Sequence, residues 1–243
     1  MSEATGGRDV GRPGLQFVRN DVYQLLVESS ADYGKESRSV LDWTDPDLLR
    51  EVLRRRLIRN SLPEDTTFAR VWSQICVSHY NGEETSQYLI DRSLMRPRNL
   101  IKLFAHCRGF AVGLERARIE EVDLEKGIHA FSIDLITEAN QELTDILGAD
   151  TDLIYHFIGE GQEFERGRLE SILRAGGVPA DKNIKVIEFM LYYGFLGVKT
   201  GNENPRYIFE LGYDMKLMSV LAKKAENNLT YVLNPAFHPG LNL

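Results

Sequence analysis

The chain has 243 residues, 43% hydrophobic and 27% charged, which suits one large or two modest globular domains. Its formal net charge of -7 disfavours a broad nucleic-acid-binding face, although a local basic patch remains compatible with it. No apolar run approaches the roughly 20 residues that cross a bilayer, so the sequence predicts a cytoplasmic protein without membrane contact. The cysteines, Cys76 and Cys107, stand in helical patterns without a C-x-x-C partner, which indicates buried thiols in a reducing compartment.

The N-terminal residues fall into two segments of different character. Residues 1–14, MSEATGGRDVGRPG, are small, polar and glycine-rich, and we expect a flexible head there. A β-prone run, LQFV (residues 15–18), then leads into RNDVYQLLVESS, which has helical character. A lone strand cannot form a sheet. The partner strands therefore come from elsewhere, or the chain is part of a larger assembly.

The middle of the chain is predicted to be helical. DPDLLREVLRRRLI begins with Asp45, which can cap a helix, and with Pro46, which suits the first turn. TTFARVWSQICVSHY carries its apolar residues at helical spacing, so we expect it to form the next helix throughout. A helix from Pro97 and another with Asp123 as its N-cap follow, and together these segments predict a helical bundle.

Two glycines, Gly109 and Gly113, lie inside the helix that starts at Pro97. In a helix interior each glycine costs about 1 kcal/mol relative to alanine. This cost predicts that another element packs closely against the helix at these positions.

The last third of the chain mixes helical and strand patterns. TDLIYHFIGE, EFERGRLESILRAGG and NIKVIEFMLYYG are three short helical segments. FLGVK and RYIFELGY read as two strands of a hairpin joined by TGNENP, and a helix (DMKLMSVLAKKAEN) and a final strand (TYVLNP) follow. Three helices followed by a hairpin predict a winged helix-turn-helix domain. The expected fold class is therefore mainly α: a helical bundle followed by a C-terminal winged helix with a β-hairpin.

The sequence lacks the motifs of several kinds of catalytic site. The nearest match to a phosphate-binding P-loop is DYGKES around Gly34 and Lys35, which lacks the first glycine and the final Ser/Thr of G-x-x-x-x-G-K-[ST]. The five histidines are scattered without metal-ligand spacing, and no serine or cysteine stands in a nucleophile motif. The sequence therefore predicts no catalytic residue and no metal site in this chain.

Three arginines surround the start of an apolar helix in YLIDRSLMRPRNLIKLFAHC (residues 88–107): Arg92, Arg96 and Arg98. The start of a helix carries a partial positive charge, which disfavours cations. One explanation is that the arginines pair with surface carboxylates. The other is that they bind an anion.

Residues 91–132, DRSLMRPRNLIKLFAHCRGFAVGLERARIEEVDLEKGIHAFS, resemble the helical lid of AAA+ and STAND-like P-loop ATPases. In those proteins an arginine at the start of a lid helix, the sensor-2 position, reaches the nucleotide γ-phosphate. Their next helix typically begins after an I-x-x-x-D phrase, which Ile119 and Asp123 match. The resemblance implies that the arginines face a nucleotide.

The likeness covers Leu15 to Leu241 and points to prokaryotic P-loop ATPases that end in a winged helix. LQFVRNDV resembles their strand that runs into R-S-D-I, with Asn20 replacing the serine. A later lysine, a tryptophan and an arginine that ends the next helix also fit: Lys35, Trp43 and Arg56. The closing YVLNPAFHPGL resembles Y-x-I-H-P-A-F, with Asn234 in place of histidine. Walker A and Walker B are missing, which implies a truncated product, a mis-annotated start or one half of a split ATPase.

The resemblance implies a division of the chain after the flexible head. Residues 15–60 are a remnant of the ATPase core, residues 61–147 are the lid bundle, and residues 148–243 are the winged-helix domain. Arg98 is the implied phosphate sensor, with Arg96 second and Arg19 near the nucleotide. ATP and Mg²⁺ are implied only when the missing half, the first expected partner, is supplied. We therefore do not expect this chain to hydrolyse ATP alone.

A winged helix can also bind DNA. The candidate contacts are Lys182 and Lys185 at the recognition helix and Arg206 at the wing. Six or more phosphate contacts normally require more basic residues than these, so we favour packing against protein. Two alternatives remain open beside the ATPase portion: a DNA-binding winged-helix regulator, and a helical interaction scaffold without a nucleotide. Formation of a homo-oligomer is also left open.

Overall fold

The computed structural model describes residues 43–59, 62–147, 152–225 and 228–243. All of them belong to one compact unit, Leu41–Leu243. The predicted flexible head, the strand at residues 15–18 and Arg19 lie outside the described residues. Within the described ranges, no helix is both long and apolar enough to span a membrane.

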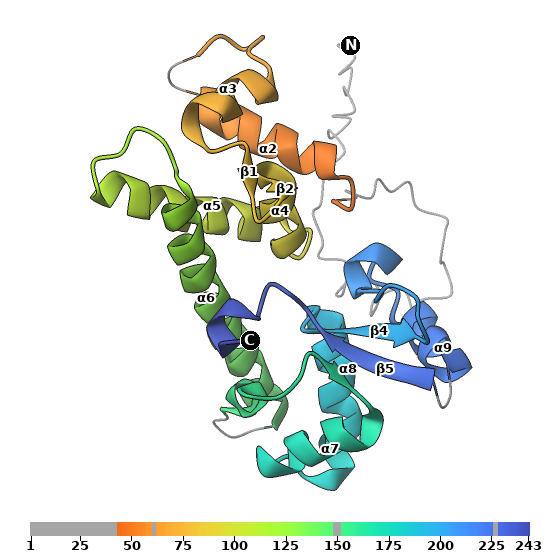
Figure 1. Ribbon diagram of the computed structural model, residues 1–243. Coiled ribbons are helices and arrows are strands. Elements are labelled where there is room, and N and C mark those ends of the chain that lie inside the picture. The colour runs from red at the N-terminus through yellow and green to blue at the C-terminus, as the bar shows by residue number, and fades with distance from the viewer. Residues whose placement is uncertain (1–42, 60–61, 148–151, 226–227) are drawn as a thin grey trace, which may run out of the picture. The chain divides into compact units, whose positions relative to one another are not determined.

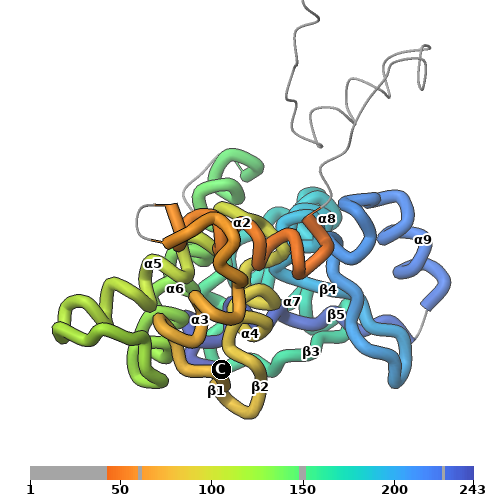
Figure 2. The backbone as a smooth tube through the Cα atoms, turned by 90° about the horizontal axis from the view of Figure 1, so that it is seen from above, coloured from red at the N-terminus to blue at the C-terminus, as the bar shows by residue number. Residues whose placement is uncertain are grey.

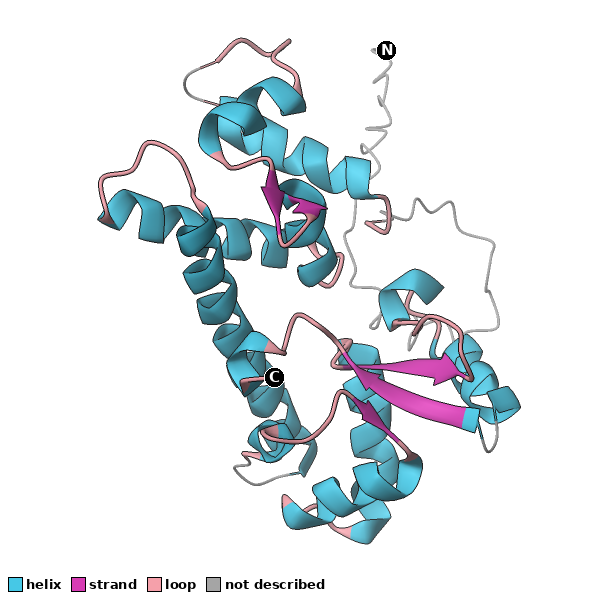
Figure 3. Cartoon of the chain, viewed as in Figure 1, coloured by secondary structure: helices cyan, strands magenta, loops and turns pink. Residues whose placement is uncertain are grey.

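The first part of the described chain is helical (Figures 1 and 3). Its helices are α2 (Pro46–Ile58), α3 (Phe68–Ile75), α4 (Thr85–Arg92), α5 (Pro97–Gly113) and α6 (Glu121–Leu147). Between α3 and α4 lies a small antiparallel hairpin of β1 (His79–Tyr80) and β2 (Glu83–Glu84). The prediction of a mainly helical protein is confirmed.

Helix α2 starts as its sequence predicts. The Asp45 carboxylate accepts a hydrogen bond from the backbone N–H of Asp47 at 2.9 Å, and Pro46 occupies the first turn. Leu49 and Leu53, one turn apart, are fully buried in the core. The local cap therefore sets where α2 begins, and its apolar face sets which side packs into the core.

Glu51 on α2 makes stability depend on pH. Its carboxylate accepts hydrogen bonds from the guanidinium groups of Arg54 and Arg55, which lower the pKa of Glu51 from 4.5 to about 2. Because the folded pKa is depressed, this stabilisation is fully present above pH 4.5 and is lost as the pH falls toward 2. Glu51 is partly exposed, so the effect stays within about 1 kcal/mol.

We therefore expect wild type to be more stable than Glu51→Gln at neutral pH, with the difference shrinking as the pH falls through that window. Urea unfolding followed by circular dichroism at several pH values measures this difference. A stability difference that stayed constant from neutral pH to pH 2 would show that the Glu51 charge does not contribute.

Helices α5 and α6 pack against each other, as both Figure 1 and Figure 2 show. They approach closely at Gly127 of α6, where an added Cβ would lie 2.6 Å from the backbone nitrogen of Cys107 and 2.6 Å from its Sγ. Cys76 and Cys107 are free, buried thiols, as predicted. Burial raises the pKa of Cys76 to about 12, and it raises the pKa of Cys107 as well. Both cysteines therefore act as small apolar residues.

The second part of the described chain combines short helices with a sheet. The elements in chain order are η1 (Leu153–Phe157), β3 (Glu163–Phe164), α7 (Arg166–Ala175), η2 (Ala180–Lys182), α8 (Asn183–Tyr193), β4 (Leu196–Thr200), η3 (Ile208–Leu211), α9 (Met215–Ala225), β5 (Leu229–Leu233) and η5 (Pro239–Leu241). The strands form one antiparallel sheet in the order β3-β5-β4. In the β4–β5 pair, Leu196 lies opposite Leu233.

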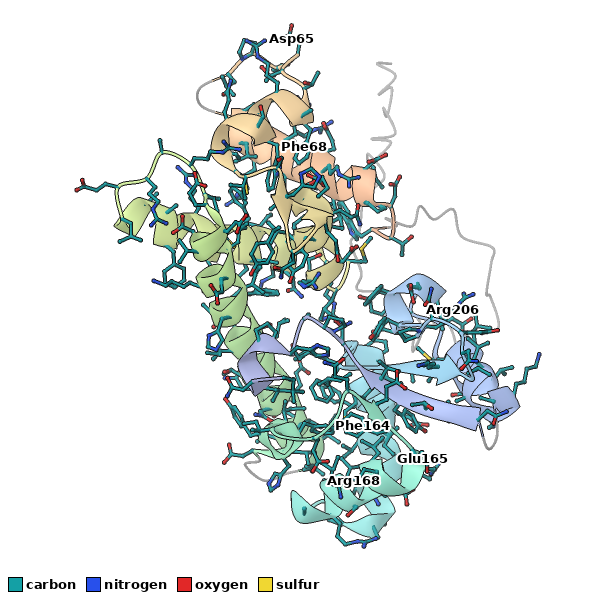
Figure 4. The ribbon with its side chains drawn as sticks, in the orientation of Figure 1. Asp65, Phe68, Phe164, Glu165, Arg168 and Arg206 are labelled. Atoms are coloured by element: carbon teal, nitrogen blue, oxygen red, sulfur yellow. The ribbon has the colours of Figure 1, made fainter. Side chains whose placement is uncertain are left out.

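Aromatic side chains form the core of this second part. The ring centroid of Phe157 lies 5.5 Å from that of Phe164, which is labelled in Figure 4, and 5.0 Å from that of Phe195. Phe195 in turn lies 4.9 Å from Phe237, and all of these pairs meet edge to face. The cluster therefore joins η1 and the sheet to the C-terminal tail, residues 234–243.

The C-terminal tail returns to the helical part. Phe237 and Leu241 are fully buried. The backbone N–H of Gly240 donates to Ser132 Oγ on α6 at 2.9 Å, and an added Cβ at Gly240 would lie 2.6 Å from Ile136. The tail therefore attaches the second part of the chain to α6.

The predicted helix over TTFARVWSQICVSHY is too long. Helix α3 ends at Ile75, and the chain then enters β1. The turn after β1 has positive φ at Asn81 (50°) and Gly82 (83°). An Asn-Gly pair is the strongest short-range signal of a two-residue hairpin, so the sequence carries a local signal for this turn.

The predicted hairpin of FLGVK and RYIFELGY is wrong in its second strand. The FLGVK run does enter β4, but the partner of β4 is β5. RYIFELGY contributes one isolated bridge, Val198 to Arg206, and then forms η3. The final strand over TYVLNP is confirmed as β5. Strand pairing depends on contacts between distant residues, which local patterns do not determine.

Asp123 is not the N-cap of its helix. Helix α6 begins at Glu121, and the carboxylate of Asp123 accepts a hydrogen bond from the backbone N–H of Glu120 at 3.0 Å. It therefore completes the first turn from inside the helix, as the third residue of a capping box does. The close packing predicted at Gly109 and Gly113 is also not found, because an added Cβ at either would meet nothing within 4 Å.

Candidate functional site

The candidate site is the elbow between α4 and α5, residues 93–96. Two consecutive residues of the elbow, Leu94 (φ 56°) and Met95 (φ 52°), have left-handed backbone conformations. This conformation costs a non-glycine residue roughly 1–2 kcal/mol. Leu94 is fully buried, and the Ser93 hydroxyl donates to the carbonyl of Ile90 at 2.7 Å. Packing therefore holds the elbow in a strained shape.

Arg96 connects the elbow to the second part of the chain. Its Nε donates to the Tyr213 hydroxyl at 3.1 Å, and its Nη2 donates to the Tyr193 carbonyl at 3.1 Å. The guanidinium carbon also lies 5.2 Å from the ring centroid of Tyr193 and 5.8 Å from that of Tyr213. None of these partners is a carboxylate. The contacts of Arg96 therefore fix the position of the elbow but do not neutralise its charge.

Arg92 is engaged within its own helix. Its guanidinium carbon lies 3.3 Å from the ring centroid of Tyr88, and Nη1 donates to the Tyr88 carbonyl at 3.3 Å. A cation stacked on an aromatic face in this way is stabilised without a carboxylate. Arg92 therefore contributes a local contact at the end of α4.

Unlike Arg92 and Arg96, Arg98 has no partner for its guanidinium among the described residues. It is exposed in the first turn of α5, and it makes no hydrogen bond or ion pair with any residue in the described ranges. The first turn of a helix also has backbone N–H groups without intrahelical acceptors, such as that of Asn99. The sequence-based alternative that Arg96 and Arg98 pair with surface carboxylates finds no such pair in the described part of the chain. The elbow therefore holds an engaged arginine, Arg96, and the adjacent first turn of α5 holds an available one, Arg98.

The basic residues that were predicted to contact DNA from the second part of the chain also differ in whether their side chains have partners. Lys182 Nζ donates to the carbonyl of Leu147, the last residue of α6, at 2.8 Å, where a cation suits the helix C-terminus. Lys185 is exposed on α8. Arg206, labelled in Figure 4, is exposed beside β4 and pairs there only through its backbone. Of these three side chains, only that of Lys182 makes a hydrogen bond to a described residue.

Sequence reasoning missed the partners of Arg96. The ring of Tyr193 is buried, which raises the pKa of its hydroxyl. The contact uses its backbone carbonyl, which any residue would supply. Tyr213 supplies a hydroxyl from 117 residues further along the chain than Arg96. No local pattern could indicate either partner.

The elbow contact can be tested by a double-mutant cycle. Arg96→Ala should destabilise the protein by about 3 kcal/mol, because two hydrogen bonds from a charged donor are lost. Tyr213→Phe removes one of them and should cost about 1 kcal/mol in wild type, but nearly nothing in the Arg96→Ala background. Urea unfolding of the four proteins measures the coupling.

Arg98→Ala is the matched control, because it removes an arginine from the same turn without removing a contact in the described structure. Its expected effect on stability is within about 0.5 kcal/mol. Equal losses from Arg96→Ala and Arg98→Ala would show that the Arg96 contacts do not hold the elbow.

One comparison with known proteins gives a match. Residues 47–140 match a family described as the FunZ-associated C-terminal helical domain. This range extends from α2 into α6 and includes the elbow. No curated protein and no solved structure matches the chain. The helical part is therefore similar to a FunZ-associated C-terminal helical domain, which fits a C-terminal helical part of a larger protein.

Proposed function

We propose that the chain is the non-catalytic C-terminal portion of an AAA+/STAND-like P-loop ATPase: a nucleotide-sensing lid followed by a winged-helix docking domain. The observation that carries the proposal is the contrast at the elbow. Arg96 is fixed to Tyr193 and Tyr213 of the second part, whereas Arg98 is exposed in the adjacent turn. One arginine is thus available to an external group while its neighbour connects the same turn to the rest of the chain.

The chemistry of Arg98 suits a phosphate. A guanidinium donates two parallel, charge-assisted hydrogen bonds to phosphate oxygens and stays protonated at all physiological pH values. The first-turn N–H groups of α5 add donors for the same anion. In the described ranges no three or more His, Cys, Asp or Glu side chains gather to hold a metal ion. The residues present therefore suit the phosphate, and Mg²⁺ would be held by the segment that carries the Walker motifs.

The strained elbow suits a conformational signal. A phosphate bound at Arg98 would favour one orientation of α5, and loss of that phosphate would remove the preference. Because Arg96 lies in the same turn, a change in α5 is transmitted to the carbonyl end of α8 and to Tyr213. The expected output is a change in how the second part meets its partner.

The element order supports a winged helix for the second part. Its main elements in chain order are a helix (η1), a strand (β3), two helices (α7 and α8) and two strands (β4 and β5). The three strands form one antiparallel sheet. η3 and α9 would then be an insertion in the wing between β4 and β5. Helix α8 takes the recognition position, and its exposed face presents Ile184 (60% exposed) beside Lys185 and Glu188. An apolar residue there favours a protein partner over DNA.

The proposal is tested with the full chain and extracts of its natural source. We expect the tagged chain to copurify with a protein carrying G-x-x-x-x-G-K-[ST], and the yield to rise with Mg-ATPγS. Arg98→Ala should abolish the effect of the nucleotide on the yield. Arg108→Ala, an exposed arginine on the same helix, is the matched control and should behave as wild type. Failure to recover any P-loop protein, or equal nucleotide dependence of wild type and Arg98→Ala, would refute the proposal.

DNA binding is tested separately by titrating duplex DNA at two salt concentrations. The protein-docking proposal predicts no salt-dependent binding. Binding that weakens steeply with salt and is lost in Lys185→Ala with Arg206→Ala would instead establish the DNA-binding regulator.

A further inference from the structure

Two surfaces of the described chain have opposite charge, and each also exposes two apolar side chains. The first, which we call the acidic tip, lies where α5 turns into α6 and consists of Leu114, Glu115, Glu120, Glu121, Val122 and Glu125. The second, the basic face, is the exposed side of α9 and consists of Leu217, Val220, Lys223 and Lys224. All of these residues are exposed.

The acidic tip is free to take a partner. None of its glutamates forms an ion pair with another described residue, and Leu114 is 53% exposed. The arginines in the same turn are engaged elsewhere: Arg116 pairs with Asp123 at 2.8 Å, and Arg118 donates to the Cys76 carbonyl at 2.8 Å. Arg118 and Lys126 are the exposed cations beside the tip in the described part of the chain, and they are fewer than its glutamates. Four glutamates around two apolar side chains therefore leave the tip with a net negative charge.

The basic face has the complementary pattern. Val220, Lys223 and Lys224 follow at intervals of three and four residues, so they share one side of α9 with Leu217. The described length of α9, MKLMSVLAKKA, contains lysines but no acidic residue, in a chain whose net charge is -7. Two apolar side chains beside two lysines form a surface that suits apolar side chains flanked by glutamates.

We propose that the acidic tip of one copy of the chain docks on the basic face of a second copy. The tip and α9 lie on different sides of the unit in Figures 1 and 2, so α9 does not cover the tip of its own copy. Because the two surfaces differ, the contact is heterologous: each copy keeps one free tip and one free basic face, and the copies add head to tail. The inference does not depend on nucleotide sensing at the elbow.

The contact has a clear signature in sedimentation velocity of the purified full chain. The average mass should rise with protein concentration and fall as salt is added, because exposed charges are screened. Lys223→Glu with Lys224→Glu should weaken association at least about tenfold, and so should Glu121→Lys with Glu125→Lys. Each doubly substituted chain should therefore sediment as a monomer.

An equal mixture of the two doubly substituted chains is the decisive sample. The acidic tip of the first chain meets the intact basic face of the second, and the lysine-bearing tip of the second meets the glutamate-bearing face of the first. The mixture should therefore regain concentration-dependent association that neither chain shows alone. Glu142→Lys with Asp145→Lys, the same charge change at exposed positions near the other end of α6, should associate as wild type.

Circular dichroism melting first establishes that each variant is folded. Wild type that stays monomeric at all concentrations would overturn the proposal, and would leave the tip to a different protein. Association that persists in either doubly substituted chain, or a mixture that stays monomeric, would equally overturn it.

Discussion

Replacing Gly127 by alanine is expected to destabilise the protein by about 2 kcal/mol or more, although alanine is the better helix former. The new Cβ would lie 2.6 Å from the backbone nitrogen, Cα and Sγ of Cys107. Two of these atoms belong to the backbone of α5, so the two helices must separate. Urea unfolding followed by circular dichroism measures the loss.

Gly109→Ala is the matched control for this prediction. Gly109 also lies inside a helix, but an added Cβ there meets nothing within 4 Å. Substitution should therefore stabilise the protein by about 0.5–1 kcal/mol through helix propensity alone. If both alanines changed stability in the same direction, close packing at Gly127 would not be the reason for its glycine.

Replacing Asp123 by alanine is expected to cost about 3–5 kcal/mol, the largest single effect that we predict. Asp123 is fully buried, yet its carboxylate accepts hydrogen bonds from Arg116 at 2.8 Å and from the backbone of Glu120 at 3.0 Å. Alanine leaves the guanidinium and the first turn of α6 without their acceptor. Asp123→Asn keeps an acceptor but removes the charge, and it should lose roughly half as much.

Arg116→Ala completes a double-mutant cycle for the ion pair between Arg116 and Asp123. Alone it leaves a buried carboxylate without its cation and should cost about 3 kcal/mol. Combined with Asp123→Asn, the total loss should be clearly smaller than the sum of the single losses. Additive losses in urea unfolding would show that the two side chains do not act as a pair.

The sequence predicted the elements that are specified locally. Asp45 and Pro46 mark the start of α2, Pro97 marks the start of α5, and the short apolar run within TYVLNP becomes β5. In each case the signal is a cap, a proline or a short period that acts within a few residues. Such signals do not require knowledge of the rest of the fold.

The errors arose where distant residues decide. RYIFELGY has strand-forming residues, but β4 pairs with β5, and the run is left to form η3. The left-handed backbone at Leu94 and Met95 is held by packing that a local pattern does not contain. Gly109 and Gly127 look alike in sequence, yet only Gly127 meets another helix.

The candidate site was predictable in part. The sequence located the arginine cluster, and its resemblance to ATPase lids singled out Arg98 and Arg96. The two could not be told apart, because their difference depends on Tyr193 and Tyr213. These partners meet Arg96 only after the second part of the chain has folded against the elbow.

The central claim is that a phosphate at Arg98 is sensed through Arg96 by the second part of the chain. Hydrogen exchange of the complex with the proposed P-loop partner, in Mg-ATPγS and in Mg-ADP, tests it most directly. We predict that ATPγS slows exchange in the first turn of α5 and changes it in residues 208–214 of wild type. In Arg96→Ala only the first effect should remain, and in Arg98→Ala neither should. Exchange at residues 208–214 that responds to nucleotide equally in all three proteins would contradict the account.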